Sequence, residues 1–91
     1  MRKLAYYEGV CDEIMGLLKQ ERERRGLSNY AVSQNSGVSE ITLSRIERRM
    51  HNPSIEMLLR IADGIGVNLG PIIMKAQKLA EKKSGPAKKT R

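Results

Sequence analysis

The sequence predicts a single all-α domain, a bundle of five helices, and three observations support this. At 91 residues the chain is long enough for one small domain but not for two. Apolar residues recur at helical spacing in five segments, and no useful length shows the alternation of a half-buried strand. These segments carry residues that typically begin or end helices. Three tyrosines are the only aromatic residues, so we expect an aliphatic core.

Local signals define the ends of the predicted helices. The helices cover residues 11–25, 29–35, 40–48 and 55–65, and a fifth begins near residue 69. A serine that can accept a hydrogen bond from the first turn precedes the second, third and fourth helices. These predicted N-caps are Ser28, Ser39 and Ser54. Gly26 and Gly66 follow the first and fourth helices, where a positive φ is common.

The helices fall within one predicted domain, residues 11–82. Residues 1–10 are assigned to an N-terminal extension, because Gly9 weakens the continuity of the helical pattern. Residues 83–91 form a basic tail, broken by Gly and Pro, that we expect to be disordered. Helical spacing predicts a core made of Ile14, Leu17, Leu18, Val32, Val38, Leu43, Ile46, Met50, Ile55, Leu58, Ile61, Ala62 and Ile65.

The net charge of +7 is concentrated at the C-terminal end of the chain. Residues 75–91 contain seven basic residues and one acidic residue, which leaves ten basic and nine acidic residues in the first 74. The body of the protein is therefore nearly neutral. A polyanionic partner is supported mainly through the tail, and any binding face on the body has to be argued residue by residue.

The composition argues against several classes of protein. The single cysteine, Cys11, excludes an intrachain disulfide, and one cysteine with one histidine cannot build a zinc site. No apolar run approaches the ~18 residues needed to cross a bilayer, so we expect no membrane contact and a cytoplasmic location. No phosphate-binding glycine loop or cleft-forming carboxylate pair is apparent. We therefore expect neither an enzyme nor a protein with a cofactor.

The two short helices around Gly37 have the pattern of a helix-turn-helix. This motif requires a small residue where the helices cross, a glycine with positive φ in the turn, and apolar residues at fixed offsets in the turn and the second helix. The sequence meets these requirements in order with Ser33, Gly37, Val38, Leu43 and Ile46.

A longer pattern is more specific. The segments "LLKQERERRGLS", "GVSEITLSRIERR" and "NPSIEMLLRIADGIGV" follow one another between residues 17 and 74. In this order and spacing the chain resembles the phage-repressor/Cro-like helix-turn-helix family, also called XRE-like. The resemblance implies a five-helix DNA-binding domain of the lambda-repressor-like type, whose third helix reads DNA. It also implies an ion pair between Arg22 and Glu47.

The chain departs from the family pattern at three positions. Ser33 stands where alanine is usual, and its small hydroxyl should be tolerated. Asn29 replaces a frequent glutamine but keeps the amide. Arg49 stands where a glycine often follows the third helix, so either the helix continues or Arg49 adopts a mildly costly conformation.

The resemblance also assigns roles in DNA recognition. It places Glu40, Ile41, Ser44 and Arg45 at or beside the positions that reach base edges. Arginine can bind guanine O6 and N7, isoleucine can contact a thymine methyl, and glutamate can accept from cytosine N4. Phosphate contacts are expected from Asn29, Tyr30, Ser39, Arg48, Arg49, His51 and Asn52.

Each assignment has a simpler alternative. The arginines of the third helix could form a solvated face, Ile41 could contact another protein, and Glu40 could only cap its helix. Tyr30 could cover the edge of the core, and His51 could be an ordinary polar loop residue. The basic tail could either add a salt-sensitive contact or only improve solubility.

Two functions are consistent with these observations. The first is a sequence-specific transcriptional regulator that binds double-stranded DNA as a homodimer on a pseudo-palindromic operator. The alternative is an antitoxin-like or cofactor-like protein-interaction module built on the same fold. A dimer is predicted because several apolar residues exceed the needs of one helical stripe. These are Leu4, Tyr6, Tyr7, Val10 and the apolar residues between 69 and 74.

Overall fold

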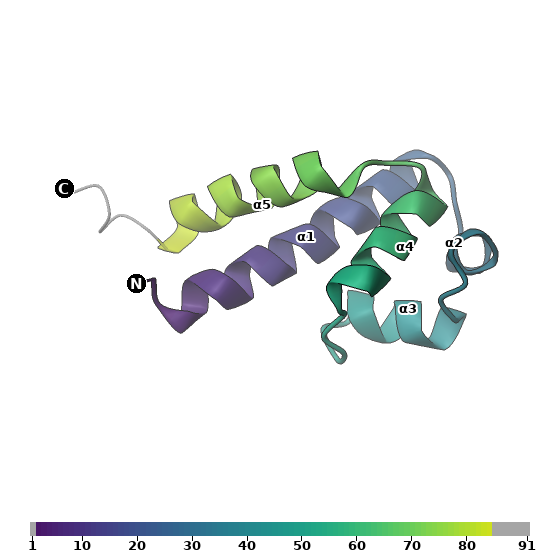
Figure 1. The fold of residues 1–91 in the computed structure, drawn as a ribbon, viewed down its shortest axis with the longest axis horizontal. Coiled ribbons are helices and arrows are strands. Elements are labelled where there is room, and N and C mark those ends of the chain that lie inside the picture. Colours follow the sequence, from purple (N-terminus) through teal and green to yellow (C-terminus); the bar gives the residue numbers. More distant parts are fainter. Residues whose placement is uncertain (1, 85–91) are drawn as a thin grey trace.

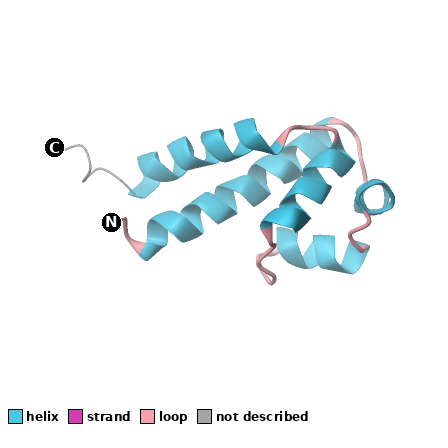
Figure 2. Cartoon of the chain, viewed as in Figure 1, coloured by secondary structure: helices cyan, strands magenta, loops and turns pink. Residues whose placement is uncertain are grey.

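The computed structural model describes residues 2–84 and is all-helical, as predicted (Figure 1). The helices are α1 (Leu4–Arg24), α2 (Asn29–Ser36), α3 (Glu40–Glu47), α4 (Ile55–Ile65) and α5 (Leu69–Ser84). Figure 2 shows only helices and connecting loops in this range, so the prediction of a five-helix all-α bundle is confirmed. Within the same range no single helix is long and apolar enough to cross a membrane. Only α4 and α5 together would reach that length, and they are bent by 112°.

The predicted signals at the helix ends are present. The hydroxyl oxygens of Ser28, Ser39 and Ser54 accept hydrogen bonds from the N–H three residues later at 3.0 to 3.1 Å. These bonds satisfy N–H groups that have no partner within the first turn. Gly26 and Gly66 have φ values of 69° and 98° after α1 and α4. Local sequence therefore determines these ends.

The start of α1 differs from the prediction. The helix begins at Leu4 rather than near residue 11, so most of the predicted N-terminal extension forms the first turns of α1. The cause is the packing of α5 along α1, which Figure 1 shows. A Cβ on Gly9 would lie 3.7 Å from the Cβ of Ala80, so small residues let the two helices approach closely. The packing outweighs the weak helix propensity of glycine.

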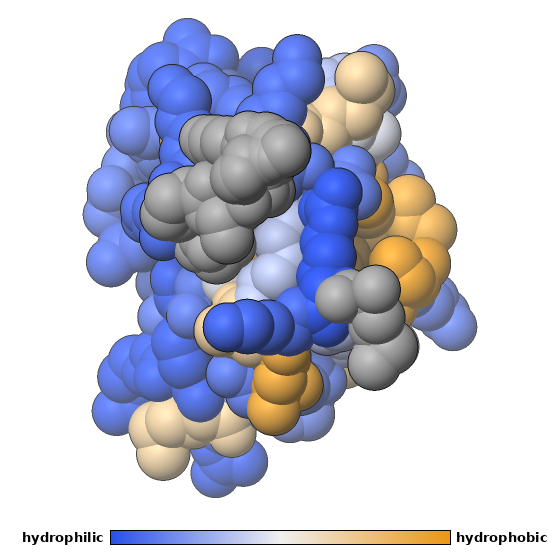
Figure 3. Space-filling view, turned by 90° about the vertical axis from the view of Figure 1, so that its left-hand side faces the viewer, coloured by the Kyte–Doolittle hydropathy of each residue, from blue (hydrophilic) through white to orange (hydrophobic). Residues whose placement is uncertain are grey.

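Charged side chains connect the N-terminal half of α1, and Arg2 just before it, to the end of α5. Arg2 forms an ion pair with Glu81 at 3.1 Å, and its guanidinium lies 4.2 Å from the centre of the Tyr6 ring. Lys83 pairs with Glu13. Figure 3 looks toward this end, where hydrophilic side chains predominate between smaller apolar patches. The predicted tail begins inside α5, because Lys83 and Ser84 are helical. Its remainder, 85–91, lies outside the described residues.

The core is aliphatic, and most of the predicted core residues are buried. Met50 and Ile55 were predicted to be buried but are 65% and 61% exposed. Since α3 ends at Glu47, Met50 has left the helical spacing that aligned it with the core. Ile55 is the first residue of α4, and its side chain is not covered. Conversely, Tyr6 is buried within this chain, so it is no longer available as surplus apolar surface for a dimer.

Helices α2 and α4 approach each other closely at Gly64. A Cβ on Gly64 would lie 2.9 Å from the Cβ of Ser36 and 3.1 Å from the carbonyl oxygen of Val32. The side-chain nitrogen of Asn35 donates to the carbonyl oxygen of Gly64 at 3.1 Å. The sequence predicted a small residue of α2, Ser33, at a helix crossing. In the structure this close approach depends on Gly64 of α4.

Candidate nucleic-acid interface

The turn between α2 and α3 has the geometry that a helix-turn-helix requires. Gly37 ends α2 with a φ of 79°, and Val38 inserts into the core. The hydroxyl oxygen of the buried Ser36 accepts from the N–H of Val38 at 3.1 Å. Ser39 caps α3, and its hydroxyl also donates to the side-chain oxygen of Thr42 at 2.9 Å. The start of α3 is thus held by both the backbone and the side chains of the turn.

Helix α3 has one buried face and one exposed face. Leu43 and Ile46 lie in the core, whereas Ile41 is 65% exposed. Arg45 in the last turn of α3 and Arg48 at its C-cap are also exposed. Within residues 2–84 neither arginine side chain has a hydrogen bond or an ion pair to another group. The exposed face therefore combines an apolar side chain with two cations that are free to bind other molecules.

A shallow depression of about 380 Å³ joins this face to the start of α2. Its lining residues are Asn29, Glu40, Ile41, Ser44 and Arg48. The structure thereby brings together residues that the sequence assigned to base reading and to phosphate binding. Arg45 follows Ser44 on the same helix and is exposed. Tyr30 is exposed beside Asn29 in the first turn of α2.

The loop after α3 lies beside α1, away from the depression on α3. Arg49, His51 and Asn52 line a second groove, of about 480 Å³, between this loop and the N-terminal half of α1. Exposed Leu4 and Tyr7 of α1 line the same groove. None of the three loop residues lines the depression on α3, so the structure separates them from the residues assigned to base reading.

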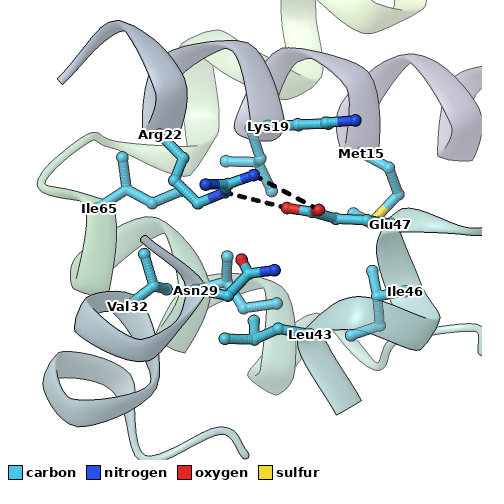
Figure 4. A pocket seen from close by; sticks show the side chains of 11 residues that line it. Met15, Lys19, Arg22, Asn29, Val32, Leu43, Ile46, Glu47 and Ile65 are labelled. Atoms are coloured by element: carbon cyan, nitrogen blue, oxygen red, sulfur yellow. Dashed lines mark hydrogen bonds and ion pairs between the residues drawn. The ribbon is translucent and has the colours of Figure 1, made fainter. Parts of the chain in front are cut away.

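The pair implied by the family resemblance, Arg22 and Glu47, is present in the structure (Figure 4). The Nε of Arg22 lies 3.0 Å from Oε2 of Glu47, and its Nη2 lies 3.5 Å from Oε1. Nη1 donates to the carbonyl oxygen of Leu27 at 2.8 Å. The two side chains are 14% and 21% exposed and lie above apolar core residues. The pair joins α1 to the last residue of α3.

Neighbouring charges do not compete strongly for Arg22. Arg24 donates to Glu21 at 2.7 Å, and this hydrogen bond lowers the pKa of the Glu21 carboxyl below its ordinary value. Glu21 is therefore ionised and engaged by Arg24. Glu23 lies farther from Arg22, at 3.8 Å, and is exposed to solvent. Arg22 consequently interacts mainly with Glu47.

Asn29 lies beside the same pair, at the first position of α2. Its side-chain oxygen is buried and has no hydrogen-bond partner among the described residues. Burying an acceptor without a donor costs free energy, so this side chain is unfavourable for folding on its own.

Arg49 has a partner that no sequence pattern indicates. This residue has a φ of 61°, the one non-glycine residue with positive φ in the described range. Its Nε lies 3.0 Å from Oδ1 of Asp12 in the middle of α1. The anomaly at Arg49 was visible as a missing glycine, but no local signal pointed to a partner 37 positions away.

Taken together, these features define a helix-turn-helix domain of the Cro/XRE-like type. The chain belongs to this family, because the helix-turn-helix family model matches residues 18–72. It is 33% identical over 70 residues to the HTH-type transcriptional regulator SutR of Escherichia coli (strain K12), covering 77% of this chain and 39% of the relative. It is 34% identical over 70 residues to the HTH-type transcriptional regulator SlrR of Bacillus subtilis (strain 168), covering 76% and 46%.

The chain thus spans less than half the length of either curated relative. No solved structure matches the chain. The shared segment includes all of the helix-turn-helix, and the family assignment therefore rests on the sequence of the region that carries the proposed site.

Proposed function

We propose that this protein is a sequence-specific DNA-binding transcriptional regulator that inserts α3 into the major groove. The observation that carries the proposal is the exposed face of α3, where Ile41, Arg45 and Arg48 are accessible and the two arginines are unpaired within residues 2–84. The names of both curated relatives, HTH-type transcriptional regulators, support this function. A cytoplasmic location belongs to the same proposal.

The base contacts follow from the chemistry of the exposed face. Arg45 donates to O6 and N7 of a guanine, and Ile41 packs against the methyl group of a thymine. Ser44 supplies a small hydrogen-bonding group between them. Glu40 accepts from cytosine N4, while its charge also suits the N-terminal end of the α3 dipole.

Phosphate contacts surround this face. Their proposed donors are the N-terminal amides of α2 and α3 and the side chains of Asn29, Tyr30, Arg48, His51 and Asn52. Ser39 would contribute its backbone N–H, because its hydroxyl already donates to Thr42. Asn29 would contribute its side-chain NH2 group, because a phosphate oxygen needs a donor and the buried Oδ1 is an acceptor.

We also propose that the protein binds DNA as a symmetric homodimer. Ile55 and Leu59 are exposed one turn apart on α4, and Met74 is exposed on α5. The two residues of α4 form an apolar surface that a second copy could cover. A dimer of this kind would recognise a pseudo-palindromic operator whose half-sites lie about one helical turn, ~34 Å, apart.

Selection of bound duplexes from a random pool, at a stated salt concentration, tests function and symmetry together. We expect enrichment of an inverted repeat. A single enriched half-site with a monomeric mass would contradict the dimer. A pool that shows no enrichment even at low salt would contradict DNA reading and favour the protein-interaction module.

A further inference from the structure

We infer that Arg49 is a positioning residue that holds the end of α3 against α1 through Asp12, and that it does not bind phosphate. For its effect on DNA, this inference rests on the proposed function. Arg49 stands at a position where the sequence departs from the family pattern. The positioning role replaces the phosphate contact that the resemblance implied for this residue.

The backbone after α3 adopts a conformation that favours glycine. After α1, the N–H of Gly26 donates to the carbonyl oxygen of Glu23 at 3.0 Å. The N–H of Leu27 donates to the carbonyl oxygen of Arg22, five residues earlier, also at 3.0 Å. In α3, Arg49 donates to Ile46 at 3.0 Å and Met50 donates to Arg45 at 2.8 Å, which is the same pattern. The φ values of Gly26 and Arg49 are 69° and 61°. An arginine is strained in this conformation, whereas a glycine is not.

Hydrogen bonds of the Arg49 side chain compensate for this backbone strain. Nε donates to Oδ1 of Asp12 at 3.0 Å, and Nη2 donates to the carbonyl oxygen of Asp12 at 3.0 Å. Nη1 donates to the carbonyl oxygen of Glu47 at 2.7 Å. Each nitrogen of the guanidinium therefore donates one hydrogen bond within the protein, and two of its five N–H groups remain. The Nε–Nη2 edge is occupied by Asp12, so it is not available to bind a phosphate through two parallel N–H bonds.

The surface of α1 accommodates this contact. Gly16 lies one turn after Asp12, and a Cβ on it would lie 4.0 Å from Nη2 of Arg49. A Cβ at that distance would make an ordinary van der Waals contact with the guanidinium, so the Arg49–Asp12 contact does not require glycine at this position. Asp12 also precedes residues 18–72, which the family model matches. This contact therefore uses a part of α1 outside the matched segment.

The Arg49 contact helps to fix the orientation of the DNA-reading helix, α3. Glu47, the last residue of α3, is held by Arg22 through its carboxylate and by Arg49 through its carbonyl. Both arginines connect it to α1. Loss of the Arg49 contact would leave one connection and would let the end of α3 and the following loop move.

Five variants separate positioning from phosphate binding. R49G removes the side chain and also relieves the positive φ, and D12A removes the partner but keeps the arginine charge. We expect each of these two substitutions to weaken binding to the selected duplex roughly threefold to tenfold. The double variant should bind no worse than whichever single variant binds less tightly, because both substitutions remove the same contact. D12N keeps an acceptor oxygen and should restore part of the affinity. E8A, which removes an exposed acid one turn earlier on α1, is the charge-matched control and should not weaken binding.

The salt dependence of DNA binding distinguishes positioning from phosphate binding. We expect the slope of log K against log salt to be the same for wild type, R49G and D12A. If Arg49 binds a phosphate, R49G should reduce the magnitude of that slope by about 0.9, and D12A should bind at least as tightly as wild type. That result would overturn the inference.

A measurement without DNA keeps this inference distinct from the proposed function. In the free protein, the Nε–H of Arg49 should exchange with water more slowly than that of Arg45, and D12A but not E8A should abolish the difference. If wild type binds no duplex but the slow exchange is present, the DNA function fails and the contact stands. Equal exchange at Arg49 and Arg45 would overturn the contact itself.

Discussion

Arg22 of α1 and Glu47 of α3 lie 25 positions apart in the sequence, and their side chains meet at 3.0 Å with little exposure to solvent. This relationship attaches the end of α3 to the longest helix of the bundle. A charge that is mostly removed from water depends on its partner, because the remaining charge cannot be fully solvated when the partner is lost.

Glu47→Ala should therefore destabilise the fold. We expect the free energy of unfolding to fall by about 2 kcal/mol, which lowers Tm by roughly 8–16 °C in a domain of this size. Thermal unfolding followed by circular dichroism measures this change. Glu56→Ala removes the acid of an exposed pair with Arg60 and should change the stability by less than about 0.5 kcal/mol. Equal losses in the two variants would contradict the importance of the Arg22–Glu47 pair.

Gly64→Ala should be costly for a different reason. The new Cβ would lie 2.9 Å from the Cβ of Ser36 and 3.1 Å from a backbone oxygen, so α2 and α4 would have to separate. We expect the free energy of unfolding to fall by about 1–3 kcal/mol in denaturant titrations. Gly70→Ala on α5 meets no atom within 4 Å and should be neutral or stabilising by up to about 1 kcal/mol. A neutral Gly64→Ala would show that the α2–α4 contact is looser than described.

Arg45→Ala should affect binding without affecting the fold. The side chain is exposed and unpaired within the described range, so its removal should change the stability by less than about 0.5 kcal/mol. Binding to the selected duplex should weaken by about 1–3 kcal/mol, measured by titration at constant salt. Lys78→Ala removes an equal charge from the exposed surface of α5 and should preserve the preference for the selected sequence. Parallel losses in both variants would indicate an electrostatic effect rather than base reading.

Ile41 can be tested by a change in the DNA. Replacing the contacted thymine by uracil removes its methyl group, and binding by the wild-type protein should weaken several-fold because apolar contact is lost. Ile41→Ala should bind the two duplexes equally. If Ile41→Ala retains full discrimination between thymine and uracil, the methyl contact belongs to another residue.

The proposed dimer depends on an apolar surface of α4. Leu59→Glu places a charge on that surface and should produce a monomeric mass in sedimentation equilibrium while the circular dichroism spectrum remains helical. Met50→Glu changes another exposed apolar residue, outside α4, and should leave the dimer intact. A wild-type protein that is monomeric at high concentration would refute the dimer directly.

The sequence by itself determined the features that depend on neighbours along the chain. Ser28, Ser39 and Ser54 cap their helices because the N–H that each satisfies lies three residues away. Gly37 supplies the positive φ of the turn. The buried and exposed faces of α3 follow from helical spacing, and the family resemblance implied the pair of Arg22 with Glu47.

Tertiary structure decided what depends on distant residues. The helix continues through Gly9 because Ala80 packs against it, and Met50 leaves the core because α3 ends before it. The sequence indicated only that Arg49 stands in an unusual place, whereas the folded chain brings Asp12 within hydrogen-bonding distance. Caps and helix faces are local and are encoded by short spacing. Helix packing and the pairing of distant charges exist only once separate segments have been brought together by burial of the core.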